Sequence, residues 1–326
     1  MKLKDTLTIL IPLRGRDYAT RKILEHMSQH HVPFKIFFAD GSDTYNANYI
    51  NVYRDRGLDI EYHYYGSDDS IYKFMRKMDL ACSSITTPLT VMIDNDDGFS
   101  LEGLIYGVNF LCNNDDFASF KEKVQDREYG PLYKMGPIVA DEAPQRIIDL
   151  LEEGRSNGGI NSEWHSMCRT HVLAKMFEII HQSKNNDFQL SHSVNKFWNL
   201  FYGKSHKGYS IPYVYHNIFS NRLPGDSVVQ HHATISRYID WPADPKFHNS
   251  MTIIASMVRC VMRYHNPDSI TNIQELIIRD PYQLGGHALS FDTVNNIIKD
   301  SHEYDTLINT ILNKPHKTPT SFRIDQ

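Results

Sequence analysis

An apolar run, Leu89–Ile93, is followed at once by Asp94, Asn95, Asp96 and Asp97, so three carboxylates lie within four residues. A short apolar run that ends in a polar turn predicts a buried β-strand. Like charges at this spacing repel one another, and a nearby cation usually compensates them. Mg²⁺ and similar ions bind carboxylate oxygens together with substrate phosphates. We therefore expect Asp94, Asp96 and Asp97 to hold Mg²⁺ or Mn²⁺; the alternative is a solvated turn.

The first hundred residues alternate between apolar runs and helical patterns. Strands are expected at Thr6–Leu13, Phe34–Ala39, Asp59–Tyr65 and Leu89–Ile93, with helices beginning at Asp17 and covering Ile71–Ser83. This order predicts a mostly parallel sheet with helices on its faces. Ligands bind at the carboxyl ends of the strands in such sheets. Asp40 and the acidic corner Asp94–Asp97 both lie at such ends, which favours a functional role for both.

The remaining chain divides at about residue 235. A helix is expected at Phe99–Leu111, and the turn signals in residues 113–165 predict an irregular segment. Further helices are expected at Val172–His181 and Val194–Tyr202, followed by a loop-rich stretch at 203–232. From residue 236 the pattern is helical again. We therefore predict an α/β domain at 1–235 and a helical C-terminal extension at 236–326.

Composition limits the classes of function. The 326-residue chain has a net charge of −5, which argues against a nucleic-acid partner bound through a general basic field. Its four cysteines form no CxxC pair, so we expect reduced thiols in a cytoplasmic protein. The first residues predict a strand and not a signal peptide. No apolar stretch approaches the roughly 20 residues of a membrane span, so no transmembrane segment is expected.

Three strand ends together resemble a known family. They are Ile11–Arg16, Ala39–Ser42 and Asp94–Asp97, in that order along the chain. The sequence resembles the GT-A fold glycosyltransferases of the family 2-like type that assemble bacterial surface polysaccharides, over roughly residues 6–235. The resemblance implies a GT-A (Rossmann-like), mostly parallel α/β sheet flanked by helices. It also implies metal-dependent transfer from a nucleotide-diphosphate sugar to the hydroxyl of a saccharide or lipid-linked saccharide, with inversion.

The resemblance assigns roles to the polar residues at these strand ends. The first strand's corner would lie under the nucleotide, Asp40 would contact the nucleoside, and Lys73 or Lys77 would approach the diphosphate. Ala39 stands where the family often has another acid, which weakens the match at the nucleoside. The residues expected to bind the donor are Pro12, Arg14, Arg16, Asp40, Lys77, Asp94, Asn95 and Arg222.

The later part of the chain carries the expected acceptor side. The segment Ser166–Leu173 resembles the family's lead-in to a catalytic carboxylate, and Asp187 falls where that base is expected, with Asn186 in place of the usual Glu. A helix N-cap is the alternative for Asp187. Glu163, Trp164 and His165 are candidates for an acceptor pocket, although Trp164 could equally be a packing residue. Arg222, with His231 or His232, could close over the diphosphate from a Gly- and Pro-rich loop.

Other functions stay open at this stage. Phosphoryl transfer of the haloacid-dehalogenase kind also places two aspartates after a strand, but Gly98 occupies the position of its Thr or Val. A sugar nucleotidyltransferase would need a Gly-rich loop after the first strand, where only Gly15 is found. A degenerate transferase retained as a scaffold or carbohydrate-binding protein is the non-enzymatic alternative. The C-terminal helices could form a homodimer, cover the acceptor groove or lie on a membrane surface.

Overall fold

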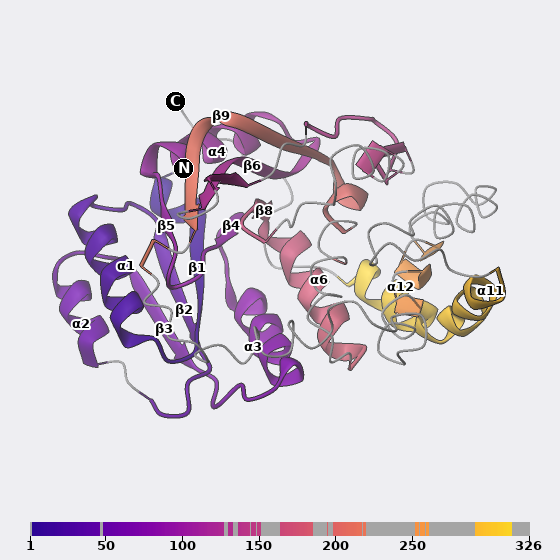
Figure 1. The fold of residues 1–326 in the computed structure, drawn as a ribbon, viewed down its shortest axis with the longest axis horizontal. Coiled ribbons are helices and arrows are strands. Elements are labelled where there is room, and N and C mark those ends of the chain that lie inside the picture. Colours follow the sequence, from indigo (N-terminus) through magenta and orange to yellow (C-terminus); the bar gives the residue numbers. More distant parts are fainter. Residues whose placement is uncertain are drawn as a thin grey trace.

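The computed structural model describes residues 2–45, 48–126, 130–132, 136–143, 145–147, 149–150, 164–184, 194, 198–216, 218–219, 252–253, 255–257, 259–260 and 291–314. Within these residues, nine strands form a single sheet (Figure 1). The strands are β1 (Leu7–Leu13), β2 (Lys35–Asp40), β3 (Ile60–Tyr64), β4 (Leu89–Met92), β5 (Gly98–Phe99), β6 (Phe117–Asp126), β7 (Gly130–Leu132), β8 (Met167–Arg169) and β9 (Lys204–His216). The α-helices are α1 (Asp17–Gln29), α2 (Asn48–Asp55), α3 (Ile71–Ser84), α4 (Leu101–Asn113), α6 (Thr170–Gln182), α11 (Phe291–Asp300) and α12 (Asp305–Asn313).

The sheet is parallel in its first part and mixed beyond it. Its order is β3-β2-β1-β4-β8-β6-β9-β5, with β7 paired to β6. β1 runs parallel to β2 and β4, and β2 runs parallel to β3, as predicted. β8 pairs antiparallel with both β4 and β6. The parallel arrangement predicted from the first hundred residues therefore holds for the first four strands, and parallel and antiparallel pairs mix in the rest of the sheet.

Alternating residues of β1 face two different apolar cores. Leu7, Ile9 and Ile11 belong to the core shared with α1, α2 and α4. Leu10 belongs to the other core, which is shared with α3 and α6. Successive side chains of a strand point to opposite faces, so a run that is apolar at every position must be covered on both sides. Figure 1 shows α1 and α2 on one side of the first four strands and α3 on the other.

Three elements differ from the expectations drawn from sequence. α2 lies between β2 and β3, and only Tyr49 and Ile50 on it are buried, so its apolar pattern was too short to detect. β6 lies in the segment that was expected to be irregular. The strand was not predicted because Lys121 and Glu122 interrupt its apolar pattern, although both are buried. The predicted loop at 203–232 contains β9, a strand of 13 residues.

Glu122 of β6 holds β6 and β9 together through contacts with residues of β9. Its carboxylate accepts the backbone N–H groups of Ser210 and Ile211 at 3.1 and 3.3 Å, and its Oε1 lies 3.1 Å from Nε2 of His206. A Cβ at Gly208 would lie 2.1 Å from the same carboxylate, so the glycine makes room for it. Because these partners satisfy it, the Glu122 carboxylate can occupy a buried strand position where an apolar side chain is usual.

The C-terminal helix α12 packs on α6. Ile308 and Ile311 of α12 belong to the same apolar core as Phe177 of α6. Lys175 Nζ donates to the carbonyl oxygen of Leu312 at 2.6 Å. A helical C-terminal part was predicted, and the boundary predicted at residue 235 lies outside the described residues. No helix in the described part of the chain is long and apolar enough to cross a membrane.

Candidate functional site

The carboxyl ends of three adjacent parallel strands meet at one edge of the sheet. Leu13 of β1 pairs with Asp40 of β2, and Leu10 pairs with Met92 of β4. The chain leaves each strand in a polar corner, so the predicted donor and metal residues of all three corners come together. Parallel pairing alone produces this convergence, because every carboxyl end then lies on the same edge.

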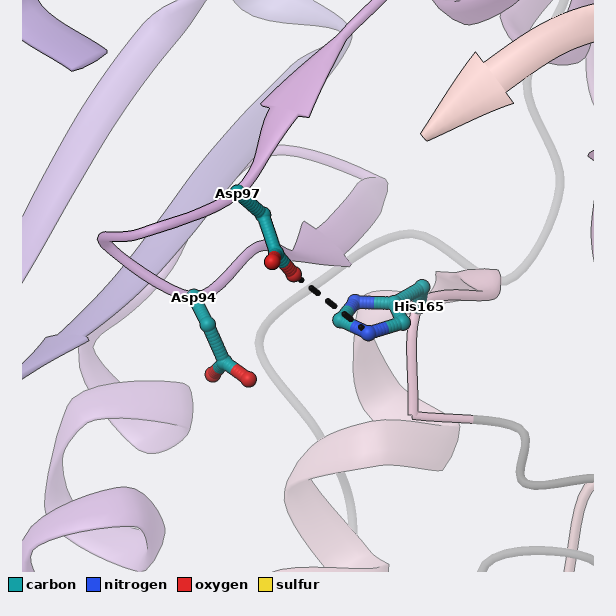
Figure 2. Close-up of side chains that lie close together, drawn as sticks. All are labelled: Asp94, Asp97 and His165. Atoms are coloured by element: carbon teal, nitrogen blue, oxygen red, sulfur yellow. Dashed lines mark ion pairs between the residues drawn. The ribbon is translucent and has the colours of Figure 1, made fainter. Parts of the chain in front are cut away.

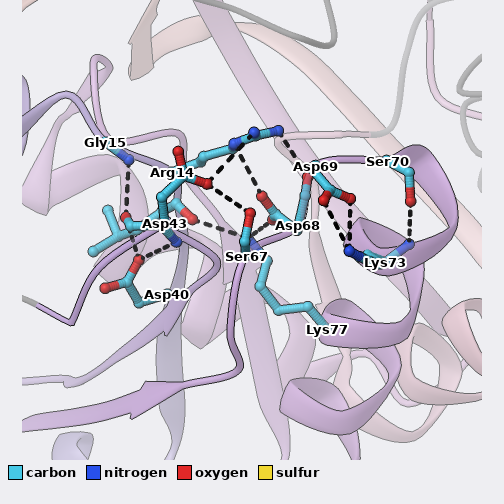
Figure 3. Close-up of polar contacts among 12 residues, drawn as sticks. Arg14, Gly15, Asp40, Asp43, Ser67, Asp68, Asp69, Ser70, Lys73 and Lys77 are labelled. Carbon is cyan, nitrogen blue, oxygen red and sulfur yellow. Dashed lines mark hydrogen bonds and ion pairs between the residues drawn. The ribbon is translucent and has the colours of Figure 1, made fainter.

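The tripeptide Arg14-Gly15-Arg16 after β1 connects the three neighbouring corners. Arg14 Nη1 donates to the carbonyl oxygen of Asp68 at 2.8 Å, and the Gly15 N–H donates to Ser42 Oγ at 2.9 Å. Arg16 Nη1 donates to Asp96 Oδ2 at 2.7 Å. Gly15 and Arg16 both have left-handed backbones, with φ of 61° and 59°. The turn therefore directs the two arginines toward different corners, and Figure 3 shows Arg14 and Gly15 in this network.

Asp40 orders the corner after β2. Its Oδ1 accepts the Ser42 N–H at 2.8 Å and the Ser42 hydroxyl at 2.5 Å. The Tyr62 hydroxyl donates to its Oδ2. Asp40 is buried, and with these partners it fixes the turn that carries Gly41 and Ser42. Its expected contact with a nucleoside remains a prediction.

A buried ion pair lies beside this corner. Lys77 Nζ is 2.5 Å from Asp68 Oδ2 and donates to the carbonyl oxygen of Leu13 at 3.0 Å, so it ties α3 to the end of β1. Burial raises the pKa of the Asp68 carboxyl, and Lys77 offsets part of that shift. Burial likewise lowers the pKa of the Lys77 ammonium. Lys73, the other predicted candidate, pairs with Asp69 at the exposed surface instead (Figure 3).

The sequence analysis did not identify Asp68. No short motif joins it to Lys77 or Arg14, because the three residues come from different segments and meet only in the fold. Arg14 Nε lies 3.6 Å from Asp68 Oδ1, so the carboxylate has a cation on each side.

The acidic corner after β4 contains a set of three potential metal ligands. Asp94, Asp97 and His165 each offer one atom, and these atoms all lie within 4.8 Å of one another. Asp97 is completely buried, and its Oδ2 is 3.5 Å from Nε2 of His165. Figure 2 shows the two aspartates on one turn and the histidine reaching toward them from another segment. Two carboxylates and an imidazole suit Mn²⁺ and similar divalent ions.

The surroundings of His165 favour a role as a ligand. Its Nδ1 lies 3.4 Å from the carbonyl oxygen of Met92. A proton on Nδ1 would be shared with that oxygen and would leave the lone pair of Nε2 directed at the aspartates. Histidine ligands commonly donate their other ring nitrogen to a carbonyl in this way. The sequence had suggested His165 for the acceptor pocket; it gave no spacing signal for this position.

Asp96 and Asn95 serve other partners in this structure. Asp96 lies outside the three-ligand set, and its carboxylate accepts Arg16. Its carbonyl oxygen accepts the Phe219 N–H at 2.9 Å. Asn95 is buried and donates to the Thr20 hydroxyl at 2.9 Å, which ties the corner to α1. The predicted roles of Asp96 in metal binding and of Asn95 in donor binding remain predictions.

Trp164 is a buried packing residue whose indole N–H also makes a polar contact. Its ring lies 6.3 Å from that of Phe74 and 6.4 Å from that of Phe177, and its Nε1 donates to Asp94 Oδ1 at 3.3 Å. With 6% of its surface exposed it offers little face for stacking on a sugar. Pro12 lies in β1 opposite Ala39. The other predicted site residues lie outside the described residues: Glu163, Asp187, Arg222, His231 and His232.

Comparison with known proteins identifies the fold. Neither a family model nor a curated protein sequence matches the chain. Solved structures do: TarS of S. aureus matches with a TM-score of 0.58 and 10% identity, over 94% of this chain and 52% of that one. Residues 1–349 of TarS in complex with UDP-GlcNAc match with a TM-score of 0.55 and 10% identity, over 94% and 89%. The chain has the GT-A fold.

The GT-A fold confirms the predicted fold class. This chain spans about half the length of the longer TarS chain and most of its 1–349 fragment. At 10% identity the likeness concerns the backbone and leaves the role of each side chain to be argued from its own contacts.

Proposed function

We propose that this chain is a glycosyltransferase that moves a sugar from a nucleoside diphosphate donor to a hydroxyl group. The observation that carries the proposal is the meeting of two polar clusters at one strand edge of a GT-A fold. One cluster contains Arg14, Lys77 and the Asp68 carboxylate between them; the other contains Asp94, Asp97 and His165. S. aureus TarS, which shares the fold, was solved with UDP-GlcNAc, and we propose a UDP-sugar as the donor class.

In this proposal Arg14 binds the nucleotide, and its neighbours hold the site in place. Arg14 is half-buried and presents a planar fork of donors, which suits phosphate oxygens. Asp40 holds the neighbouring corner rigid, and Lys77 holds the end of β1 against α3. Rigid positioning of this kind lowers the entropy lost when a donor binds. Arg222 would contribute from its own segment.

The acidic corner would hold a divalent cation, Mg²⁺ or Mn²⁺. Asp94, Asp97 and His165 supply oxygen and nitrogen atoms close enough to share one ion, and Asp96 stands beside them on the same turn. A histidine ligand favours Mn²⁺ over Mg²⁺, which prefers oxygen. Such an ion would neutralise the charge that develops on the leaving diphosphate.

For the acceptor, we propose a hydroxyl of a saccharide or lipid-linked saccharide. Asp187 would take the proton from that hydroxyl as the new C–O bond forms. Direct attack opposite the leaving group would invert the anomeric centre. A cytoplasmic location at the inner face of the membrane and a homodimer belong to the same proposal. The GT-A fold favours this chemistry over phosphoryl transfer of the haloacid-dehalogenase kind.

A thermal-shift experiment tests donor and metal together. The protein is heated with UDP-GlcNAc or UDP, in Mn²⁺ and in EDTA, with UMP as the control that lacks a β-phosphate. A ligand at one hundred times its Kd adds about 2.7 kcal/mol of stability, which raises Tm measurably. We expect a large shift with UDP and Mn²⁺ and a small one with UMP or EDTA. No metal-dependent shift with any nucleoside diphosphate, or hydrolysis of a generic phosphate ester, would count against the proposal.

A further inference from the structure

The three aspartates of the acidic corner have three different partners. Asp94 accepts the indole N–H of Trp164, and Asp97 faces His165. Asp96 pairs with a permanently charged side chain, the guanidinium of Arg16, at 2.7 Å. The positively charged Arg16 guanidinium therefore already occupies one of the carboxylates that were expected to bind a metal ion.

Arg16 holds this position at a cost in backbone energy. Its φ of 59° is left-handed, a conformation that is unfavourable for a non-glycine residue. Its own carbonyl oxygen accepts the Thr20 N–H at 3.0 Å, so the backbone is fixed as the start of α1. Its side chain is about one-third exposed, whereas that of Asp96 is mostly buried. The backbone is therefore anchored, while the guanidinium at the end of a long side chain can move away from Asp96.

We propose that Arg16 and a divalent cation compete for Asp96. Without metal, the Arg16 guanidinium neutralises Asp96 and keeps it outside the group formed by Asp94, Asp97 and His165. When a cation binds that group, Asp96 turns to it and Arg16 is released. This inference rests on the proposed function, because it assigns a regulatory role within the same donor site.

In this proposal the diphosphate of a bound donor would be the new partner of the released Arg16 guanidinium. Arg16 belongs to the same tripeptide as Arg14, the residue proposed to bind the phosphates, and its guanidinium reaches the acidic corner. The metal and the nucleoside diphosphate should therefore bind cooperatively. The metal displaces Arg16 from Asp96, and the diphosphate gives the displaced guanidinium a new anionic partner. Such coupling is reciprocal: the factor by which one ligand tightens the other is the same in both directions.

The test measures Mn²⁺ affinity without nucleotide, by titration calorimetry and by electron paramagnetic resonance of the free ion. Arg16→Asn removes the competing charge and keeps a residue type that tolerates the left-handed backbone. We expect it to bind Mn²⁺ about fivefold more tightly, which is the factor that corresponds to loss of a partly exposed ion pair. Arg16→Lys keeps a cation and should stay within about twofold of wild type. Lys22→Asn, which removes an exposed cation that pairs with Glu25 on α1, is the control and should leave Mn²⁺ affinity unchanged.

Asp96→Asn completes a double-mutant cycle. In that background Arg16→Asn should no longer tighten Mn²⁺ binding, because the shared carboxylate is absent. In the presence of Mn²⁺, Arg16→Asn should weaken UDP binding about tenfold through loss of its phosphate contact.

An unchanged or weaker Mn²⁺ affinity in a folded Arg16→Asn protein overturns the inference, as does an equal gain in the Asp96→Asn background. If Arg16→Asn does not fold, Arg16→Gly, which removes the side chain and the backbone penalty together, carries the same expectation. Failure of the proposed function looks different: the wild type would then show no Mn²⁺-dependent binding of UDP.

Discussion

The buried Lys77–Asp68 pair offers the sharpest test of how this strand edge is held together. Lys77→Met keeps the length of the side chain and removes its charge, so the Asp68 carboxylate loses its nearest cation. The two side chains are only 2% and 3% exposed, and their charged atoms are 2.5 Å apart. The perturbation therefore leaves a charge in a region that water hardly reaches.

The expected cost follows from this geometry. Removing one partner of a buried ion pair destabilises a protein by about 3–5 kcal/mol. Arg14 Nε remains 3.6 Å from Asp68 Oδ1, which places the expected loss near the lower limit, about 3 kcal/mol. Asp68→Asn should cost a similar amount, since it leaves the Lys77 ammonium buried. The double variant should lose about 3 kcal/mol and not about 6, a coupling of about 3 kcal/mol.

Urea denaturation of the four proteins measures these free energies, with Lys73→Met as the control on the same helix. Lys73 forms an exposed pair with Asp69, so its loss should cost less than about 0.5 kcal/mol. A coupling between Lys77 and Asp68 smaller than about 0.5 kcal/mol would refute the reasoning.

The effect of Lys77→Met should also depend on pH. Burial raises the pKa of Asp68 above its unfolded value, so the folded state favours the protonated carboxyl more than the unfolded chain does, and loss of Lys77 should strengthen this preference. Its favourable contribution is present at acid pH and is lost as the pH rises through the folded pKa. The gap in stability between wild type and variant should therefore be largest near neutral pH and narrow on acidification.

Three further outcomes are expected at the site. Gly41→Ala would place a Cβ 2.2 Å from Asp68 Oδ2. We expect the free energy of unfolding, measured with urea, to fall by about 2 kcal/mol, and UDP binding to weaken. Gly57→Ala, where a Cβ meets open space, should leave UDP binding unchanged. Asp97→Asn should abolish the Mn²⁺-dependent thermal shift with UDP, and a retained shift would remove Asp97 from the metal site. Asp187→Asn should lower kcat about 10²-fold or more and leave donor affinity nearly intact; loss of affinity at unchanged kcat would contradict its role as the base.

The first part of the fold could be predicted because its signals are local. The apolar run of β1 and the periodic apolar residues of α1 and α3 appear in consecutive sequence, and the observed elements agree with the expected ones to within a residue or two. β6 and β9 could not be predicted in this way. The carboxylate of Glu122 is stabilised by backbone groups from β9, and Gly208 leaves room for it, so neither strand shows a local apolar pattern.

The candidate site divides in the same manner. Asp40 and the acidic corner were found because they follow apolar strands in the sequence. Asp68 and the ligand position of His165 were not found, because Asp68 contacts Arg14 and His165 contacts Asp97, each far away in the chain. Asp187, the expected base, lies outside the described residues and remains a prediction.

By itself, the sequence determined that polar residues would gather where parallel strands end, because strand direction and burial follow from short-range patterns. Only the tertiary structure decided which partner each aspartate would have. Asp96 and Asp97 are neighbours on one turn, yet one faces Arg16 from the end of β1 and the other faces His165 from the segment before β8. Electrostatic partners are chosen by distance in space, and distance in space is fixed by the packing of the whole chain.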